Sequence, residues 1–167
     1  MSVAEVAQNQ SSINLVENEV QLCGFNIGGG YYSIPVLEVQ EVVKPQKITK
    51  VPLAPSYIDG LINLRGQIVT AINLRELFGL GKKEEDSQEF MNIIVRSSDD
   101  SLYALVVDEI LDVMYIDNST YEDTPETLDK KIKKFISGVY KLDEKLLILL
   151  SLNKLLNIDS IKGEDYE

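Results

Sequence analysis

The sequence predicts a mainly β protein built from two related subdomains, each a small antiparallel barrel. Three observations support this prediction: short runs that alternate apolar and polar residues, turn residues every ~8–12 positions, and a repeat of about half the chain. The 167 residues suffice for one compact unit or two very small ones, and the 44% hydrophobic content supports a core.

The repeat consists of two runs that recur in the same order. Residues 60–78, GLINLRGQIVTAINLRELF, align without a gap with residues 138–156, GVYKLDEKLLILLSLNKLL, at an offset of 78. Residues 32–43, YSIPVLEVQEVV, align with residues 103–114, YALVVDEILDVM, at an offset of 71. The smaller offset of the earlier run indicates a longer loop in the second half. That loop is Asp117–Lys131, which is rich in Ser, Thr, Asp and Pro.

The repeat divides the chain into two subdomains, at residues 19–81 and 82–158, with exchange of strands between them left open. The charge run at residues 81–89 is the expected linker, and the acidic ends at 1–18 and 159–167 are expected to be solvated tails. A barrel of ~70 residues has a thin core. We therefore expect a sizeable apolar interface between the two barrels.

Each subdomain should contain two hairpins, because alternating runs flank short turn sequences. The turns are the glycines 28–30, Arg65-Gly66, Asp99-Asp100 and Asp143-Glu144. The flanking runs, expected as strands, are 20–27, 31–39, 57–64, 67–74, 90–98, 101–110, 136–142 and 145–152.

A short helix should follow the second hairpin strand of each half. Asn73 is a good N-cap, Glu76 stands at N3, and Gly79 lies where the helix should stop. The repeat counterpart of Asn73 is Ser151, another favourable N-cap residue. Arg75 then lies in the first helical turn, and we expect it to be a solvated surface charge.

Several residue types that carry chemistry are missing. The chain has no histidine, and its one cysteine, Cys23, alternates with apolar residues and is expected to be a buried structural thiol. The glycines at 28–30 lack the spacing of a phosphate-binding loop. The carboxylates expected to be solvated include Asp99, Asp100, Asp108 and Glu109. We therefore expect no enzyme activity, no metal and no cofactor.

Charge and hydropathy restrict the partners. The formal net charge of −11 disfavours nucleic acid, and with it an RNA-binding barrel protein. No apolar run reaches the ~20 residues of a membrane span, and the first residues lack the pattern of a signal peptide. We expect a cytoplasmic protein that does not insert into the membrane.

Arg65 is the charged residue that the repeat singles out. It ends a strand and enters a turn, and its counterpart in the second half is Asp143. Glu41, in turn, corresponds to Asp112, so only the first half can form a Glu–Arg pair. An arginine needed to build the barrel should not have an acid as its counterpart. We interpret Arg65 as a binding residue rather than a surface ion-pair residue worth ~0–1 kcal/mol.

Residues 37–80 contain four motifs in order. They are V-x-E-[IV] at 39–42, V-P-x-x-P at 51–55, a core ending in N-L-R-G at 60–66, and [IV]-x-L-R-x-x-F at 72–78. In these motifs the chain resembles the CheW-like family of bacterial chemotaxis coupling proteins. The resemblance covers about residues 19–158 and includes the second half, so the chain would be one CheW-like domain overall.

The resemblance implies two SH3-like, five-stranded barrels packed face to face around a shared apolar interface. It also implies a non-catalytic adaptor that links the tips of transmembrane chemoreceptors to the histidine kinase CheA, in the cytoplasm at receptor arrays. Chemotaxis is one such pathway, and an adaptor for pilus or gliding motility is the alternative. The chain resembles the stand-alone form of the family, because it shows no receiver or kinase domain.

The family's key polar pair falls on Glu41 and Arg65, the pair that the repeat also marks. The partner-binding residues expected from the motifs are Glu41, Arg65, Val39, Val42, Gly60, Leu61, Asn63 and Gly66. We hypothesise that Val39, Val42 and Leu61 line or support a groove between the barrels, with a place in the core as the alternative.

Overall fold

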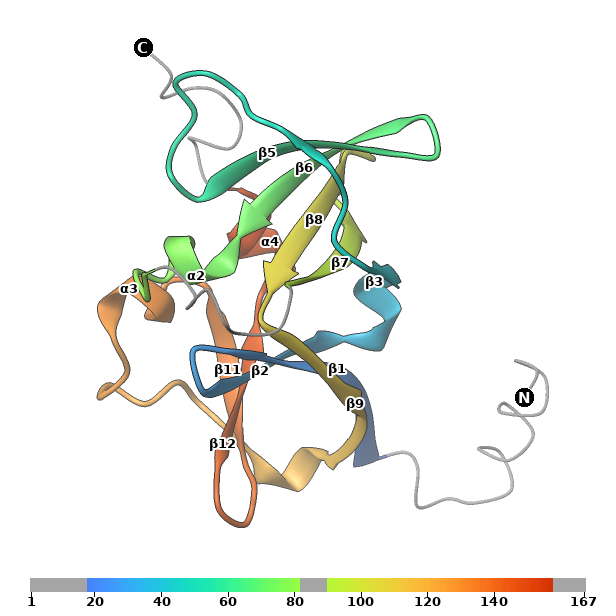
Figure 1. The fold of residues 1–167 in the computed structure, drawn as a ribbon. Helices are drawn as coiled ribbons and strands as arrows, with labels where there is room; N and C mark the ends of the chain where they lie inside the picture. The colour runs from blue at the N-terminus through green and yellow to red at the C-terminus, as the bar shows by residue number, and fades with distance from the viewer. Residues whose placement is uncertain (1–17, 82–89, 158–167) are drawn as a thin grey trace, which may run out of the picture.

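The computed structural model describes residues 18–81 and 90–157, which form two six-stranded sheets and a few short helices (Figure 1). The mainly β class predicted from the sequence is confirmed. Within the described ranges, no helix has the length and apolar character that crossing a membrane requires. The two tails and the charged linker fall almost wholly outside the described residues.

We name the two sheets by their place in the chain. The terminal sheet contains β1 (Glu19–Ile27), β2 (Gly30–Pro35), β9 (Glu109–Asp117), β10 (Tyr121–Glu122), β11 (Ile136–Lys141) and β12 (Leu146–Leu150), in the order β10-β11-β12-β2-β1-β9. The central sheet contains β3 (Val39–Val43), β4 (Ile48–Thr49), β5 (Ile58–Leu64), β6 (Gln67–Asn73), β7 (Met91–Arg96) and β8 (Leu102–Val107), in the order β3-β7-β8-β6-β5-β4.

The two sheets are copies of one arrangement. Reversed, the central order β4-β5-β6-β8-β7-β3 matches the terminal order when strands are paired through the sequence repeat. The strand register also repeats. Thr70 lies opposite Tyr103 in a parallel pair of strands, and their repeat counterparts, Ile148 and Tyr32, lie opposite each other in the other sheet. The β5–β6 and β11–β12 hairpins also shift register at equivalent places, before Gly60 and before Gly138. The repeat is therefore present in the fold down to single residues.

Each sheet combines strands from both halves of the sequence. The β1–β2 hairpin joins β9–β12, and the β7–β8 hairpin joins β3–β6, so the sheets do not divide the chain at residue 82. The structure also has six strands per sheet where five were expected. The added strands β4 and β10 have two residues each, too few for an alternating pattern to be read from the sequence.

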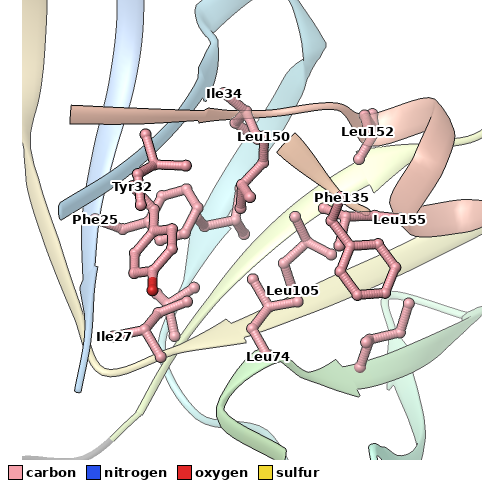
Figure 2. Close-up of a cluster of buried hydrophobic side chains, with 14 of the residues drawn as sticks. Phe25, Ile27, Tyr32, Ile34, Leu74, Leu105, Phe135, Leu150, Leu152 and Leu155 are labelled. Carbon is pink, nitrogen blue, oxygen red and sulfur yellow. The ribbon is translucent and has the colours of Figure 1, made fainter. Parts of the chain in front are cut away.

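The expected apolar interface lies between the sheets. Side chains from both sheets and from the short helices form one buried cluster, in which Figure 2 shows Phe25 and Tyr32 on one side and Leu74 and Leu105 on the other. Rings continue through this core from Phe25 to Tyr32, Phe78 and Phe135, with neighbouring centroids 5.4–6.2 Å apart. A smaller cluster fills the hollow of each sheet. Cys23 is buried as expected, and burial raises the pKa of its thiol.

The predicted helix caps are confirmed in both halves. Asn73 Oδ1 accepts a hydrogen bond from Glu76 N (3.2 Å) at the start of α2 (Leu74–Leu77), and Ser151 Oγ accepts one from Lys154 N (3.2 Å) at α4 (Leu152–Leu156). After α2 the chain leaves the helix at Gly79, where φ is +73°. The predicted long loop contains the 3-10 turn η3 (Asn118–Thr120), β10 and the start of α3 (Lys130–Lys133).

Candidate partner-binding surfaces

Glu41 and Arg65 form an ion pair that joins β3 to the β5–β6 turn of the central sheet. Arg65 Nη2 donates to Glu41 Oε2, and the side chains are 67% and 30% exposed, respectively. Arg65 and Gly66 form the β5–β6 turn with φ of +51° and +86°, which matches the tight hairpin turn predicted there. Asn63 Oδ1 accepts a hydrogen bond from Gly66 N at 2.9 Å, so Asn63 fixes the shape of that turn. The turn presents Arg65 to solvent from a rigid base.

The repeat counterparts of this pair behave as the sequence predicts. Asp112 and Asp143 are both exposed, and two like charges cannot pair. The central sheet alone therefore carries this polar contact, although its fold is the same as that of the terminal sheet.

The other predicted site residues occupy different environments. Val42 is 39% exposed on the outer side of β3, whereas Val39 is half-buried and packs against the core between the sheets. Leu61 is half-buried on β5. Gly60 is buried, its φ is +143°, and a Cβ there would overlap the carbonyl oxygen of Thr49. Gly60 thus permits β4 to approach β5 and offers no side chain to a partner.

A groove of about 430 Å³ opens between the two sheets. Its floor includes Leu149, Leu152 and Leu156 from β12 and α4. Polar residues surround that floor: Glu38 from the 3-10 turn η2 (Val36–Glu38), Arg96 and Ser98 from the β7–β8 hairpin, and Asn153 from α4. Partial burial raises the pKa of the Glu38 carboxyl.

The groove matches the hypothesis of a cleft between the barrels but not the residues named for it. Val39, Val42 and Leu61 are not among the described residues that line it. Its lining comes from four distant stretches of chain, which no local motif brings together. Strand β3 nevertheless connects the groove to the ion pair. Gln40, which precedes Glu41, accepts a hydrogen bond at Oε1 from Nε of the groove residue Arg96 (3.3 Å).

A second hollow, of about 630 Å³, lies at one end of the terminal sheet. It is lined by Val20, Leu22, Tyr140 and Tyr115, and by Leu37 from η2. Leu37 is 98% exposed and Tyr115 is 62% exposed, which is unusual for large side chains grouped at one opening. One feature of the sequence could have indicated this site. Leu37 stands at the position that Asp108 occupies in the other repeat, so an apolar residue replaces a charged one.

Arg75 and Asp108 are not the solvated charges that the sequence predicts. Arg75 Nε lies 3.5 Å from Asp108 Oδ1, and their side chains are only 16% and 13% exposed. Asp108 Oδ2 also accepts a hydrogen bond from Gly28 N at 2.8 Å. The prediction was wrong because the partners come from segments far apart in sequence, and a short helix alone does not show what packs over it.

Residues 18–81 and 90–157 contain no group of three or more His, Cys, Asp or Glu side chains placed to hold a metal ion. The surfaces described above offer apolar hollows and charged rims, which suit the binding of protein segments better than chemistry on a small molecule.

Comparison with known proteins gives one consistent match. The family model for the CheW-like domain matches residues 21–160. The chain is 33% identical over 143 residues to the chemotaxis protein CheW of Helicobacter pylori, covering 86% of this chain and 85% of that protein. It is 33% identical over 136 residues to the chemotaxis protein CheW of Bacillus subtilis, covering 81% and 86%.

A solved structure agrees with these sequence matches. The crystal structure of scaffolding protein TtCheW from Thermoanaerobacter tengcongensis matches with a TM-score of 0.74 and 34% identity. The match covers 84% of this chain and 94% of that chain, so it includes both sheets rather than one.

Proposed function

Because the chain belongs to the CheW-like family of chemotaxis scaffold proteins, we propose that it is a non-catalytic adaptor that couples chemoreceptors to the kinase CheA. Its partners would be the cytoplasmic tips of methyl-accepting chemoreceptors and the CheW-like regulatory domain of the kinase. The observation that best supports two partners is the presence of two hollows, which adjoin each other at Pro35 and Leu149.

The receptor tip is proposed to bind along the groove between the sheets. A receptor tip is a helical hairpin, and an amphipathic helix docks by placing apolar side chains in a hydrophobic groove. Leu149, Leu152 and Leu156 offer such a floor, and the charged rim at Glu38 and Arg96 can fix the orientation of the helix.

Arg65 is proposed to be the main polar anchor beside this groove. Its guanidinium is 67% exposed although it is paired with Glu41, so it keeps donors for a partner carboxylate or carbonyl. The turn that Asn63 and Gly66 shape holds Arg65 before the partner arrives, which lowers the entropic cost of binding. Val42, which faces the opposite side of β3 from Glu41, and Leu61 would add apolar contacts of their own.

The kinase is proposed to bind at the open end of the terminal sheet. Exposed Leu37 and Tyr115 surround a hollow whose floor is apolar, the composition typical of an interface centre. This hollow shares Pro35 and Leu149 with the groove between the sheets, so a partner bound around Leu37 and Tyr115 would have to leave Leu152 and Leu156 to the receptor. Receptor and kinase could then be held at once, and many such weak contacts in an array would act multivalently.

In the cell this adaptor would work in the cytoplasm, and receptor binding would recruit it to membrane-associated arrays. The choice between chemotaxis and a related motility pathway depends on which receptor it accepts, so receptor fragments of both kinds belong in the test.

Isothermal titration calorimetry with full-length protein tests the proposal. Titration with a receptor signalling fragment and with the kinase regulatory domain should each give one-to-one binding. Binding of the second partner should persist after saturation with the first. Failure to bind either partner, or mutually exclusive binding, would contradict an adaptor that holds both.

A further inference from the structure

The Arg75–Asp108 ion pair lies where the two sheets meet. Arg75 belongs to α2, which follows β6 of the central sheet, and Gly28 belongs to the β1–β2 turn of the terminal sheet. Asp108 stands between β8 and β9, where the chain crosses from one sheet to the other. Asp108 N also donates to Asn26 O (3.1 Å). We call this contact of Arg75, Asp108 and Gly28 the polar tie.

The tie is also packed, and its hydrogen bonds are those of Gly28 N and Asp108 N rather than one between the two charged groups. Gly28 has a φ of +57°, and a Cβ built there would lie 3.0 Å from Leu80 Cδ1 and 3.5 Å from Arg75 Nη1. The β1–β2 turn therefore rests directly on α2 and the residues after it. The turn, α2 and the crossover are held together at one side of the interface.

The internal repeat places the groove at the equivalent position on the other side. There α4 replaces α2, the β7–β8 turn replaces the β1–β2 turn, and η2 replaces the crossover at Asp108. Strand β1 matches β7 because Phe25 pairs with Ile110 as Val95 pairs with Val39. All three replacing elements contribute to the lining of the groove.

None of the residues of the tie is kept on that side. Asn153 stands in place of Arg75, and Leu37, which is 98% exposed, stands in place of Asp108. The β7–β8 turn contributes Ser97 and Ser98 to the lining of the groove. The interface between the sheets is thus closed by a polar tie on one side and open as a cavity on the other.

We propose that the polar tie sets the angle between the two sheets and thereby sets the width of the opposite groove, so that Arg75 and Asp108 are positioning residues for the groove's partner. The shared core alone holds the sheets together, but apolar packing has little directional preference. A largely buried ion pair whose carboxylate also accepts a backbone hydrogen bond favours one geometry, because rotation would separate desolvated charges from their partners. The consequence for binding rests on the proposed function, whereas the angle between the sheets does not.

The test compares two variants of equal net charge in the full-length protein. Arg75→Met with Asp108→Asn removes the ion pair without leaving an uncompensated buried charge. The matched control, Lys141→Met with Glu122→Gln, removes an exposed ion pair (3.6 Å) that joins β10 and β11 within one sheet.

Spin labels at Gln67→Cys and Glu144→Cys report the angle, because these exposed sites lie at the hairpin tips of the central and terminal sheets (Figure 1). The native thiol of Cys23 is buried and should remain unlabelled. Pulsed electron–electron double resonance, which measures the distance between the two spin labels, should give the same narrow distribution for the otherwise unchanged protein and for the control variant. The tie variant should give a shifted or broadened distribution.

Binding to a receptor signalling fragment is the second readout. If the orientation that accepts a helix falls to about a fifth of the population, the dissociation constant rises about fivefold. An unchanged distance distribution in the folded tie variant would overturn the proposal, and a changed distribution with unchanged binding would overturn its link to the groove. If the double variant does not fold, Asp108→Asn alone, which keeps an acceptor for Gly28 N, is judged by the same criteria.

The two proposals fail separately. A receptor fragment that does not bind even the otherwise unchanged protein would contradict the proposed function, while the distance distributions still decide the role of the tie. Equal binding and equal distances in all proteins would leave the adaptor function standing and reject the tie.

Discussion

Arg65 is ion-paired with Glu41 although their strands are far apart in the order of the central sheet. Glu41 lies on β3 at one edge of that sheet, and Arg65 follows β5, next to the opposite edge strand β4. The contact therefore brings the two edges of the sheet together as in a barrel. The terminal sheet has the same strand order with acids at both positions, so this contact is not a requirement of the fold.

Arg65→Asp should leave the protein folded and impair coupling. The exposed ion pair contributes ~0–1 kcal/mol to stability, and Asp tolerates the left-handed conformation of this turn better than most residues. Thermal unfolding should change little, whereas receptor-dependent kinase activation should fall severalfold. Unfolding of the variant would show that Arg65 is structural and would refute the argument from the repeat.

Exchange of the two charges, Glu41→Arg with Arg65→Glu, distinguishes the role of the ion pair within the fold from the role of the charge that the surface presents to a partner. The exchange restores an ion pair within the protein but presents the opposite charge to a partner. We expect stability to be kept and coupling to remain impaired. Full recovery of coupling would mean that the pair acts only within the fold.

Gly60→Ala should destabilise the protein more than Gly138→Ala. At Gly60 a Cβ would meet the Thr49 backbone and the φ is +143°, whereas at Gly138 it would meet the Tyr121 side chain, which can move. We expect a loss of about 2 kcal/mol or more for Gly60→Ala and a smaller loss for its repeat counterpart. Urea unfolding measures both. Equal losses would contradict a backbone clash at Gly60.

Asn73→Ala and Ser151→Ala remove equivalent helix caps but should respond differently to pH. Each should cost about 1 kcal/mol from the lost cap. Asn73 Nδ2 also donates to the Asp59 carboxylate (3.3 Å), and this hydrogen bond lowers an Asp59 pKa that burial raises above its ordinary value of 3.8. Loss of the amide should raise that pKa further.

The direction in which stability changes with pH follows from proton binding. A carboxyl whose pKa is higher in the folded state binds more protons folded than unfolded, so stability falls as pH rises through the window above 3.8. The extra cost of Asn73→Ala over Ser151→Ala should therefore widen as the pH is raised from about 4 to about 7.5. Urea unfolding at both pH values checks this. A constant difference would exclude Asp59 as the cause.

Leu37→Ser should weaken binding of the kinase domain without destabilising the protein. The side chain is 98% exposed at the end of the terminal sheet, so the free energy of unfolding should change by no more than about 0.5 kcal/mol. At an interface centre its loss should raise the dissociation constant about tenfold. Leu53→Ser, at a side chain 94% exposed elsewhere, is the matched control and should bind normally.

Local chemistry and the internal repeat made much of the fold predictable. Hairpin turns at Arg65-Gly66, caps at Asn73 and Ser151, and the core between two half-sized units depend on residues close in sequence or on a pattern seen twice. The Glu41–Arg65 pair was predictable for the same reason, because its counterparts Asp112 and Asp143 showed that the fold does not need it.

Contacts between distant segments were not predictable. Arg75 was expected in solvent because nothing near it in the sequence reveals that Asp108 and Gly28 pack over it. The groove lining was missed for the same reason, since Glu38, Ser98 and Asn153 meet only after the hairpins have exchanged between sheets. Two-residue strands such as β4 carry too few residues for any periodicity.

The rate of kinase autophosphorylation tests the central claim most directly. The kinase CheA would be assayed with assembled receptor signalling fragments, in the presence and absence of this protein. The adaptor account predicts a large increase that requires all three components and is lost with Arg65→Asp. An unchanged rate on addition of the folded protein, with receptor fragments and kinase both active in a control assembly, would contradict it.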